Sequence, residues 1–342
     1  MTSASEEFDR SILARSQLKK IGLQEVLNME GLTEVAVNEP GRIWFDCGNG
    51  WQYKAAPDCT FQQCLRLANS LSVFSNSGEV VGSKNPIQSV VLPDGQRGQI
   101  VLPPATLNGQ VSMTIRKPSD TRFTLGGYAS SGRLSGFKRA RKVTHDLSDY
   151  QKSMLEMLAK EDMASFFQTA VNNYLNILLV GGTGSGKTTF MKAVADLYPE
   201  DRRIFTIEDV HELSLPYHQN KVHLFYHKDG VKPKQIIEAC MRMKPDHVFL
   251  AELRGDEAWN YIEMLNTGHS GSITTTHAND CYSAFSRLAA LVKQSEVGQT
   301  LDYDFILNTV KSSIDIVCFF KHSYLKEIYF NPEEKNLILS NM

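Results

Sequence analysis

The residues best suited to chemistry lie in one glycine-rich stretch, which reads Gly-Gly-Thr-Gly-Ser-Gly-Lys-Thr over residues 181–188. This stretch fits the pattern G-x-x-x-x-G-K-[ST], in which glycines let successive backbone N–H groups point at phosphate oxygens. Lys187 can reach the β- and γ-phosphates, and the Thr188 hydroxyl can complete the coordination of Mg²⁺. The stretch therefore predicts a nucleoside triphosphate site with contacts from Gly182, Thr183, Gly184, Ser185, Gly186, Lys187, Thr188 and Thr189.

The segments on either side of the loop support this interpretation. Residues 176–180 form a short apolar run of strand type, and residues 188–197 are compatible with a helix. The order strand, loop, helix places the helix N-terminus at the bound anion. A glycine-rich turn without a ligand is the alternative, and the correct flanking segments make it the weaker one.

Polar side chains follow three further apolar strands, where parallel sheets bind their ligands. Hydrolysis needs a carboxylate that orients the attacking water, and Mg²⁺ needs oxygen ligands directly or through water. We expect Glu252 to position the water and Glu208 to assist through the metal or a second water, while a helix cap or a solvated turn is the alternative for each. The histidines that could contact the γ-phosphate are His269 and His277.

Composition limits what can surround this site. The chain has 342 residues, 42% of them hydrophobic, and no apolar run long enough to cross a bilayer, which predicts a cytosolic protein of two domains. A net charge of −2 argues against a protein that mainly wraps nucleic acid. The six cysteines form no C-x-x-C pair. His218, His223 and His227 are spaced like metal ligands, but without supporting cysteines a metal site there is disfavoured.

The sequence divides into two domains joined by a basic segment. Residues 1–130 mix helix-like stretches with short alternating strands and predict an amino-terminal α+β domain. Residues 131–146 read as an exposed linker, whose charge is a solvated surface or a contact with acidic lipid headgroups or a neighbouring subunit. Residues 147–342 alternate helical patterns with apolar strands, which predicts a three-layer α/β domain of the P-loop NTPase (RecA-like) class.

Four segments of the second domain together carry a family resemblance. They resemble the Walker A loop, acidic box, Walker B strand and histidine box of the secretion and traffic ATPases, at residues 181–188, 203–213, 243–255 and 267–278. In the first domain, residues 32–41, 92–100 and 114–119 resemble the VirB-type ATPase of type IV secretion and conjugation systems. The absence of a cysteine-rich metal insert disfavours the type II branch.

This resemblance implies a hexameric, Mg²⁺-dependent ATPase, with ATP bound between two tiers of domains at the cytoplasmic face of the inner membrane. It implies partners among inner-membrane channel components and coupling ATPases, and an indirect action on translocated protein or DNA. The arginines best placed to reach the phosphates from the first domain are Arg97 and Arg116, with Arg203, Arg242 and Arg254 as alternatives in the second domain.

Other functions remain open at this level. A type IV pilus or type II secretion motor would share the same motifs. A small-molecule kinase would need a pocket for a second substrate, of which residues 1–130 give no sign. A non-catalytic ring gated by nucleotide would tolerate loss of Lys187, Glu208 or Glu252, yet all three residues are present.

Overall fold

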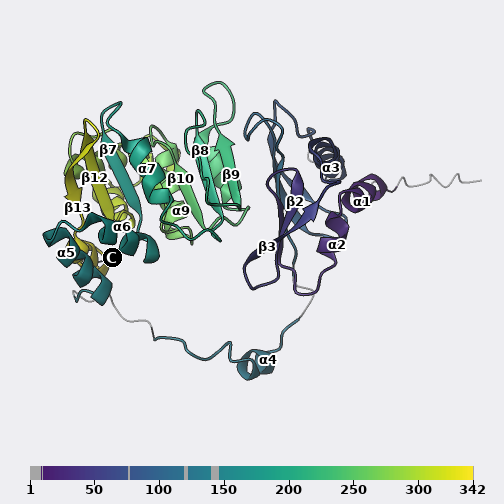
Figure 1. Ribbon diagram of the computed structural model, residues 1–342, viewed down its shortest axis with the longest axis horizontal. Coiled ribbons are helices and arrows are strands. Elements are labelled where there is room, and N and C mark those ends of the chain that lie inside the picture. The colour runs from purple at the N-terminus through teal and green to yellow at the C-terminus, as the bar shows by residue number, and fades with distance from the viewer. Residues whose placement is uncertain (1–8, 10, 76–77, 119–121, 140–145, 342) are drawn as a thin grey trace, which may run out of the picture.

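Two separate β-sheets organise the chain (Figure 1). The computed structural model describes residues 9, 11–75, 78–118, 122–139 and 146–341. The first sheet has six strands in the order β3-β2-β1-β6-β5-β4, and the second has seven in the order β13-β12-β7-β11-β10-β8-β9. The predicted combination of an α+β domain and an α/β domain is confirmed.

The first sheet is antiparallel and is covered by three helices, α1 (Ser11–Lys20), α2 (Leu23–Leu27) and α3 (Phe61–Phe74). Helices α1 and α2 are separated at Gly22, whose φ of 79° lies in the left-handed region. The strands are β1 (Glu34–Val37), β2 (Gly41–Asp46), β3 (Trp51–Ala56), β4 (Ile87–Val91), β5 (Arg97–Val101) and β6 (Ser112–Arg116).

The second sheet is parallel except for β13, which pairs antiparallel with β12. Its faces are both buried, since Leu178 and Val180 of β7 belong to one apolar cluster and Ile177 and Leu179 to the other. The strands are β7 (Ile177–Gly181), β8 (Ile204–Glu208), β9 (Lys221–Phe225), β10 (His247–Leu250), β11 (Ile273–Thr276), β12 (Ile316–Lys321) and β13 (Tyr324–Tyr329).

Helices cover both faces of this sheet, as the three-layer prediction required. Residues of α8, α9, α10 and α12 share a cluster with one face, and residues of α5, α6 and α7 share a cluster with the other. No helix among the described residues is both long and apolar enough to cross a membrane. The helices are α5 (Asp149–Ala159), α6 (Met163–Asn172), α7 (Lys187–Ala195), α8 (Pro233–Cys240), α9 (Glu257–Asn266), α10 (Cys281–Val292), α11 (Glu296–Thr300), α12 (Tyr303–Ser313) and α13 (Pro332–Asn341).

The first domain packs against the β9 edge of the second sheet (Figure 1). Thr106 forms a bridge with Leu224 of β9, and the Thr106 hydroxyl donates to the carbonyl of His223 at 2.9 Å. Arg203 of the second domain is fully buried there and donates to Asn38 Oδ1 at 3.0 Å and Thr114 Oγ1 at 3.1 Å. The edge of the large sheet is therefore covered by the same chain.

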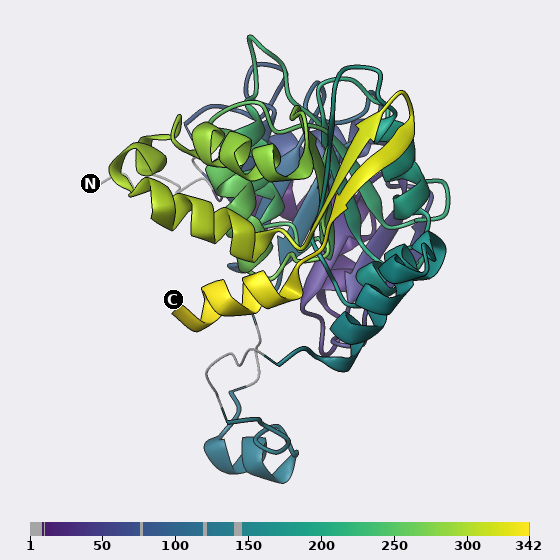
Figure 2. The ribbon, with the colours of Figure 1, turned by 90° about the vertical axis from the view of Figure 1, so that its left-hand side faces the viewer.

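A long connection joins the domains (Figures 1 and 2). It begins after β6 of the first sheet, contains α4 (Leu125–Ser130) and ends at α5 of the second domain. Helix α4 has no buried residue, so it belongs with the connection and not with the first domain. The connection thus runs over residues 117–148 and includes the predicted linker 131–146, of which residues 140–145 lie outside the described part.

Candidate nucleotide site

The glycine-rich loop joins β7 to α7 at the carboxyl edge of the large sheet, as predicted. Gly181 has φ 146°, and a Cβ there would lie 2.3 Å from the backbone oxygen of Phe320. Gly186 has φ 91° and caps the N-terminus of α7, with Ser323 Cα 3.2 Å from an added Cβ. Only glycine fits these two positions, because each combines an unusual φ with a close neighbour.

The loop presents groups that fit a nucleotide phosphate. Lys187 Nζ donates to the carbonyls of Gly181 at 3.0 Å and Gly182 at 2.9 Å, so its ammonium is held over the loop. Residues 182–184 and Thr189 are exposed, and Thr188 is half-buried in the first turn of α7. Burial lowers the pKa of Lys187, and the charge of Glu252 partly opposes that shift. Thr188 would supply the hydroxyl ligand of Mg²⁺.

The β12–β13 hairpin contacts the side of the phosphate loop and supports it. No motif in the sequence predicts this contact. The N–H of Ser323 donates to the Ser185 carbonyl at 3.2 Å. His322 and Ser323 form the turn between the two strands and both have positive φ, 52° and 65°. The only sequence signal for this turn is a short polar pair between two apolar runs, and nothing in it indicates which loop it touches.

Glu252 lies beside the phosphate loop, as predicted from its place after β10. Its Oε1 is 3.1 Å from His277 Nε2, and His277 Nδ1 donates to the Gly181 carbonyl at 2.9 Å. The Glu252 side chain is only 14% exposed. The strand order explains this proximity, because β11 lies between β7 and β10 and carries His277 just after its end.

Arg254 links this carboxylate to the acidic segment after β8. Its guanidinium donates to Glu252 Oε2 at 2.7 Å and to Asp209 Oδ2 at 3.0 Å. The Glu252 carboxylate raises the pKa of Arg254 further above its usual range. From the sequence, Arg254 was predicted only as an alternative cation, and no role was predicted for Asp209. The placement of the planar Arg254 guanidinium between two carboxylates depends on the three-dimensional structure.

Glu208 lies at the end of β8, which β10 and β11 separate from the strand β7 that leads into the phosphate loop. Its side chain is fully buried and accepts hydrogen bonds from the N–H groups of Glu212 and Leu213, both at 2.7 Å. A third bond comes from the Thr206 hydroxyl at 2.8 Å. Within the described residues, no hydrogen bond or ion pair joins Glu208 to residues 181–189.

His269 lies at the opposite edge of the sheet from the phosphate loop. It precedes β11, whereas His277 follows that strand, and its Nδ1 donates to the Pro245 carbonyl at 2.9 Å. The parallel register of β11 with β7 places the two ends of β11 at opposite edges. The structure thus brings His277, and not His269, to the loop of the same subunit.

Arg97 and Arg116 lie directly opposite each other on β5 and β6 of the first sheet. Both are exposed, and Arg116 Nε is 3.8 Å from Glu34 Oε1. The first domain meets its own second domain at β9, at the far side of the sheet from β7. Among the described residues, neither arginine forms a hydrogen bond or an ion pair with the loop of the same chain.

The two other arginines considered as phosphate ligands serve the contact between the domains. Arg203 is the buried residue that donates to Asn38 and Thr114, and burial lowers its pKa to about 9. Arg242 donates to Ser89 Oγ at 3.0 Å. Of the alternatives in the second domain, only Arg254 therefore lies at the candidate site.

Comparison with known proteins shows which family the chain belongs to. A profile of the family described as "Type II/IV secretion system protein" matches residues 17–319. The chain is 37% identical to the type IV secretion system protein VirB11 of Brucella suis over 321 residues, which cover 90% of this chain and 88% of that protein. It is 38% identical to VirB11 of Bartonella henselae over 92% of this chain and 93% of that one.

The same comparison extends to a third genus and to a solved structure. The PtlH homologue of Bordetella bronchiseptica is 35% identical over 85% of this chain and 86% of that one. The crystal structure of the VirB11 ATPase from the Brucella suis type IV secretion system, in complex with sulphate, covers 96% of this chain and 97% of its own, with a TM-score of 0.89 and 37% identity. The chain therefore belongs to the type II/IV secretion system protein family and, within it, to the VirB11-type type IV secretion ATPases.

Proposed function

We propose that this protein is a hexameric, Mg²⁺-dependent ATPase that powers a type IV secretion or conjugation system, in pilus assembly and substrate translocation. The observation that carries the proposal is the contact between Glu252 and the phosphate loop through His277. It places a carboxylate of the kind that orients water next to a lysine of the kind that binds phosphates.

The residues in and beside the phosphate loop have separate roles in ATP hydrolysis. Lys187 exchanges its two carbonyl contacts for β- and γ-phosphate oxygens, and Thr188 holds Mg²⁺. Mg²⁺, when bound, neutralises the charge that develops on the phosphates. Glu252 orients the water, and His277 and Arg254 fix its carboxylate in place. Positioning and electrostatics account for the catalysis, because phosphoryl transfer needs little covalent help.

The sequence position of Glu208 favoured a role in assisting hydrolysis through the metal or a second water. In this scheme Glu208 instead holds the backbone of the segment after β8. Both of its carboxylate oxygens accept hydrogen bonds from the protein, and two of these bonds hold the backbone at Glu212 and Leu213. A carboxylate used in this way shapes the acidic segment, which in turn presents Asp209 to Arg254. We therefore favour Glu252 over Glu208 as the group that positions the water.

The position of Arg97 and Arg116 supports the proposal of a ring. The like charges of Arg97 and Arg116 face each other directly, and among the described residues the ion pair with Glu34 compensates Arg116 alone, so a further anion would stabilise the pair. The first domain packs on β9, and β8, β10 and β11 lie between β9 and β7, the strand that leads into the phosphate loop of the same chain. We propose that the two arginines reach the phosphates held by a neighbouring subunit, which requires a closed ring.

The connection between the domains has an exposed apolar and basic surface that suits contact with a membrane. Five of its apolar side chains are exposed: Phe123, Leu125, Tyr128, Leu134 and Phe137. Together with the basic residues of the predicted linker they suit a surface of acidic lipid. We propose a position at the cytoplasmic face of the inner membrane, with channel components and coupling ATPases as partners and protein or DNA as indirect substrates.

The experiment that tests this function measures ATP hydrolysis across a size-exclusion profile, with and without nucleotide. The wild-type protein should hydrolyse ATP in the fractions of hexamer size. Lys187→Ala should abolish hydrolysis while the protein stays folded, and Lys192→Ala on the same helix should remain active. Wild-type turnover by a folded Lys187→Ala protein would exclude the phosphate-loop mechanism, and equal turnover by a monomer would exclude the ring.

A further inference from the structure

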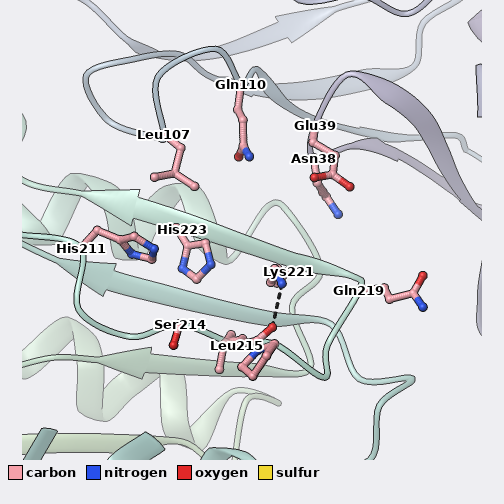
Figure 3. Close-up of a pocket in the computed structure, with 11 residues that line it drawn as sticks. Asn38, Glu39, Leu107, Gln110, His211, Ser214, Leu215, Gln219, Lys221 and His223 are labelled. Atoms are coloured by element: carbon pink, nitrogen blue, oxygen red, sulfur yellow. Dashed lines mark hydrogen bonds between the residues drawn. The ribbon is translucent and has the colours of Figure 1, made fainter. Parts of the chain in front are cut away.

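A pocket of about 260 Å³ lies between the two domains, on the β9 side of the large sheet (Figure 3). The first domain contributes Asn38, Glu39, Leu107 and Gln110, and the second contributes residues of β9 and of the segment after β8. His211 and His223 lie beside each other on its wall, with ring centroids 4.5 Å apart. The pocket is far from the nucleotide chemistry proposed above, at the other side of β10 and β8.

Three potential ligand atoms converge where these histidines meet Glu208. Glu208 Oε1 is 3.4 Å from His211 Nδ1 and 3.9 Å from His223 Nδ1. Ligand atoms of all three residues lie within 4.8 Å of one another. Tetrahedral Zn²⁺ with bonds of about 2.1 Å separates its ligand atoms by about 3.4 Å. The ligand atoms of Glu208, His211 and His223 are therefore close to this spacing, and the widest pair must approach by no more than about 1.4 Å to match it.

We propose that Glu208, His211 and His223 form a binding site for a divalent transition-metal ion of the Zn²⁺ class, distinct from the nucleotide magnesium. Two imidazoles and one carboxylate are a ligand set that favours Zn²⁺ and its neighbours over Mg²⁺. Because only three protein ligands converge and two of them line a pocket, the fourth position is open to water.

The strands explain why these residues meet. β8 and β9 are parallel, and Thr206 pairs with His223, so these two side chains and that of Glu208 lie on one face of the sheet. His211 returns to the same place because the segment after β8 bends back, held by the bonds from Glu212 and Leu213 to Glu208. The histidines that were spaced like ligands separate instead: His218 contacts the Tyr198 carbonyl and His227 the Pro104 carbonyl.

The chemistry of the surroundings suits a cation. Among the described residues, the groups within ion-pair distance of the buried Glu208 carboxylate are the two histidines. His223 is 5% exposed, so its imidazole is largely shielded from water. Thr206 donates its one hydroxyl proton to Glu208 Oε1, so His223 Nδ1, at 2.8 Å, donates to the Thr206 oxygen. Nε2 is then the ring nitrogen of His223 left for a metal, and Thr206 has the position of an outer-shell group that orients two ligands at once.

The proposed metal site is also connected to the nucleotide site through Asp209 and Arg254. Asp209 follows Glu208 directly and forms the ion pair with Arg254 that continues to Glu252. A metal that fixes Glu208 and His211 would therefore restrain the segment that carries Asp209. The pocket wall above it belongs to the first domain, so the same ion lies at the contact between the domains.

The test titrates Co²⁺, a spectroscopic substitute for Zn²⁺, into the untagged full-length protein without nucleotide and with Mg²⁺ in excess. We expect one equivalent to bind with the visible absorption of a tetrahedral site, and Zn²⁺ to displace it. His211→Ala should weaken binding at least about 100-fold, more than the loss of an outer-shell partner does. Thr206→Val should weaken it about 10- to 100-fold.

The controls separate this site from chance binding and from misfolding. His227→Gln changes an exposed histidine on the same side of the domain contact and should bind Co²⁺ like the wild type. His211 is 38% exposed at its side chain, so its replacement should leave the circular dichroism spectrum unchanged. Binding that survives in His211→Ala, or the absence of a stoichiometric tetrahedral signal in the wild type, would overturn the proposal. Neither result bears on ATP hydrolysis, which is measured separately.

Discussion

His277 and Glu252 face each other at 3.1 Å, and the other ring nitrogen of His277 donates to the phosphate loop at Gly181. A carbonyl can only accept a hydrogen bond, so the His277 Nδ1 is the donor to Gly181, and Nε2 faces the carboxylate. The ring thereby joins the two halves of the proposed site, and it lies at the end of the strand that separates them.

Replacing Glu252 with Gln should stop hydrolysis without preventing nucleotide binding. The amide keeps the shape of the side chain but loses the charge that orients the water, so turnover should fall about 10²- to 10⁴-fold. Turnover and nucleotide affinity should be measured on the same preparation. Glu263→Gln, an exposed glutamate on the neighbouring helix α9, is the matched control and should behave like the wild type. Equal losses of affinity and turnover would mean that Glu252 holds the metal instead.

His277→Ala should reduce turnover less severely than Glu252→Gln does. The carboxylate loses one charged hydrogen bond but keeps Arg254, so we expect a loss of roughly 10- to 100-fold in kcat with little change in KM. His269→Ala, at the other edge of the sheet, is the comparison. A larger effect from His269 than from His277 would contradict the arrangement described here, unless the contact is made between subunits.

Arg116→Ala and Lys187→Ala should each be inactive alone but complement each other when mixed. If the arginine serves the loop of a neighbouring subunit, a random mixture restores roughly one quarter of the sites. Subunits must be mixed under conditions that let rings exchange, and hydrolysis is the readout. A mixture that stays inactive, although exchange is verified with labelled subunits, would place Arg116 on its own subunit or outside the chemistry.

The stability of the first domain should decrease between about pH 4.5 and pH 7 through Glu34. Burial, only partly offset by Lys244, Arg116 and Arg203, raises the pKa of Glu34 to about 7. The folded state therefore binds a proton that the unfolded state releases, so stability is greatest below the unfolded pKa and is lost as pH rises.

Thermal unfolding of Glu34→Gln and the wild type at pH 5 and pH 8 tests this expectation. The variant should lose most of the difference between the two pH values, and it should be the more stable protein at pH 8. Glu79→Gln, in an exposed position of the same domain, should keep the wild-type difference. An unchanged pH dependence in Glu34→Gln would assign it to other groups.

The sequence allowed much of the site to be predicted, because each prediction rested on local pattern. The loop 181–188 and the strands around it fix Lys187, Thr188 and Glu252 through spacing and through the rule that ligands bind at the carboxyl edge. His277 follows from the same rule. The fold class also follows, since apolar periodicity distinguishes the two domains.

The features that could not be predicted depend on the direction in which a side chain points and on contacts between residues that are distant in the sequence. Glu208 and Asp209 are neighbours in sequence, yet they point to opposite sides of β8, so the first meets two histidines and the second meets Arg254. The buried role of Arg203 depends on the first domain covering β9, which no local pattern encodes. The position of His269 depends on direction as well, because it precedes β11 and therefore lies at the other end of that strand from the loop of the same chain.

The hairpin that supports the phosphate loop has a consequence for synthesis of the chain. Phe320 and Ser323 contact Gly181 and Gly186 across well over one hundred residues of intervening sequence. A ribosome completes the loop long before it completes these contacts, so the nascent domain carries a nucleotide motif whose shape is not yet enforced. We expect ATP affinity to arise late during translation, only after the final strands have joined the sheet, and to be acquired in one step with the closing of that edge.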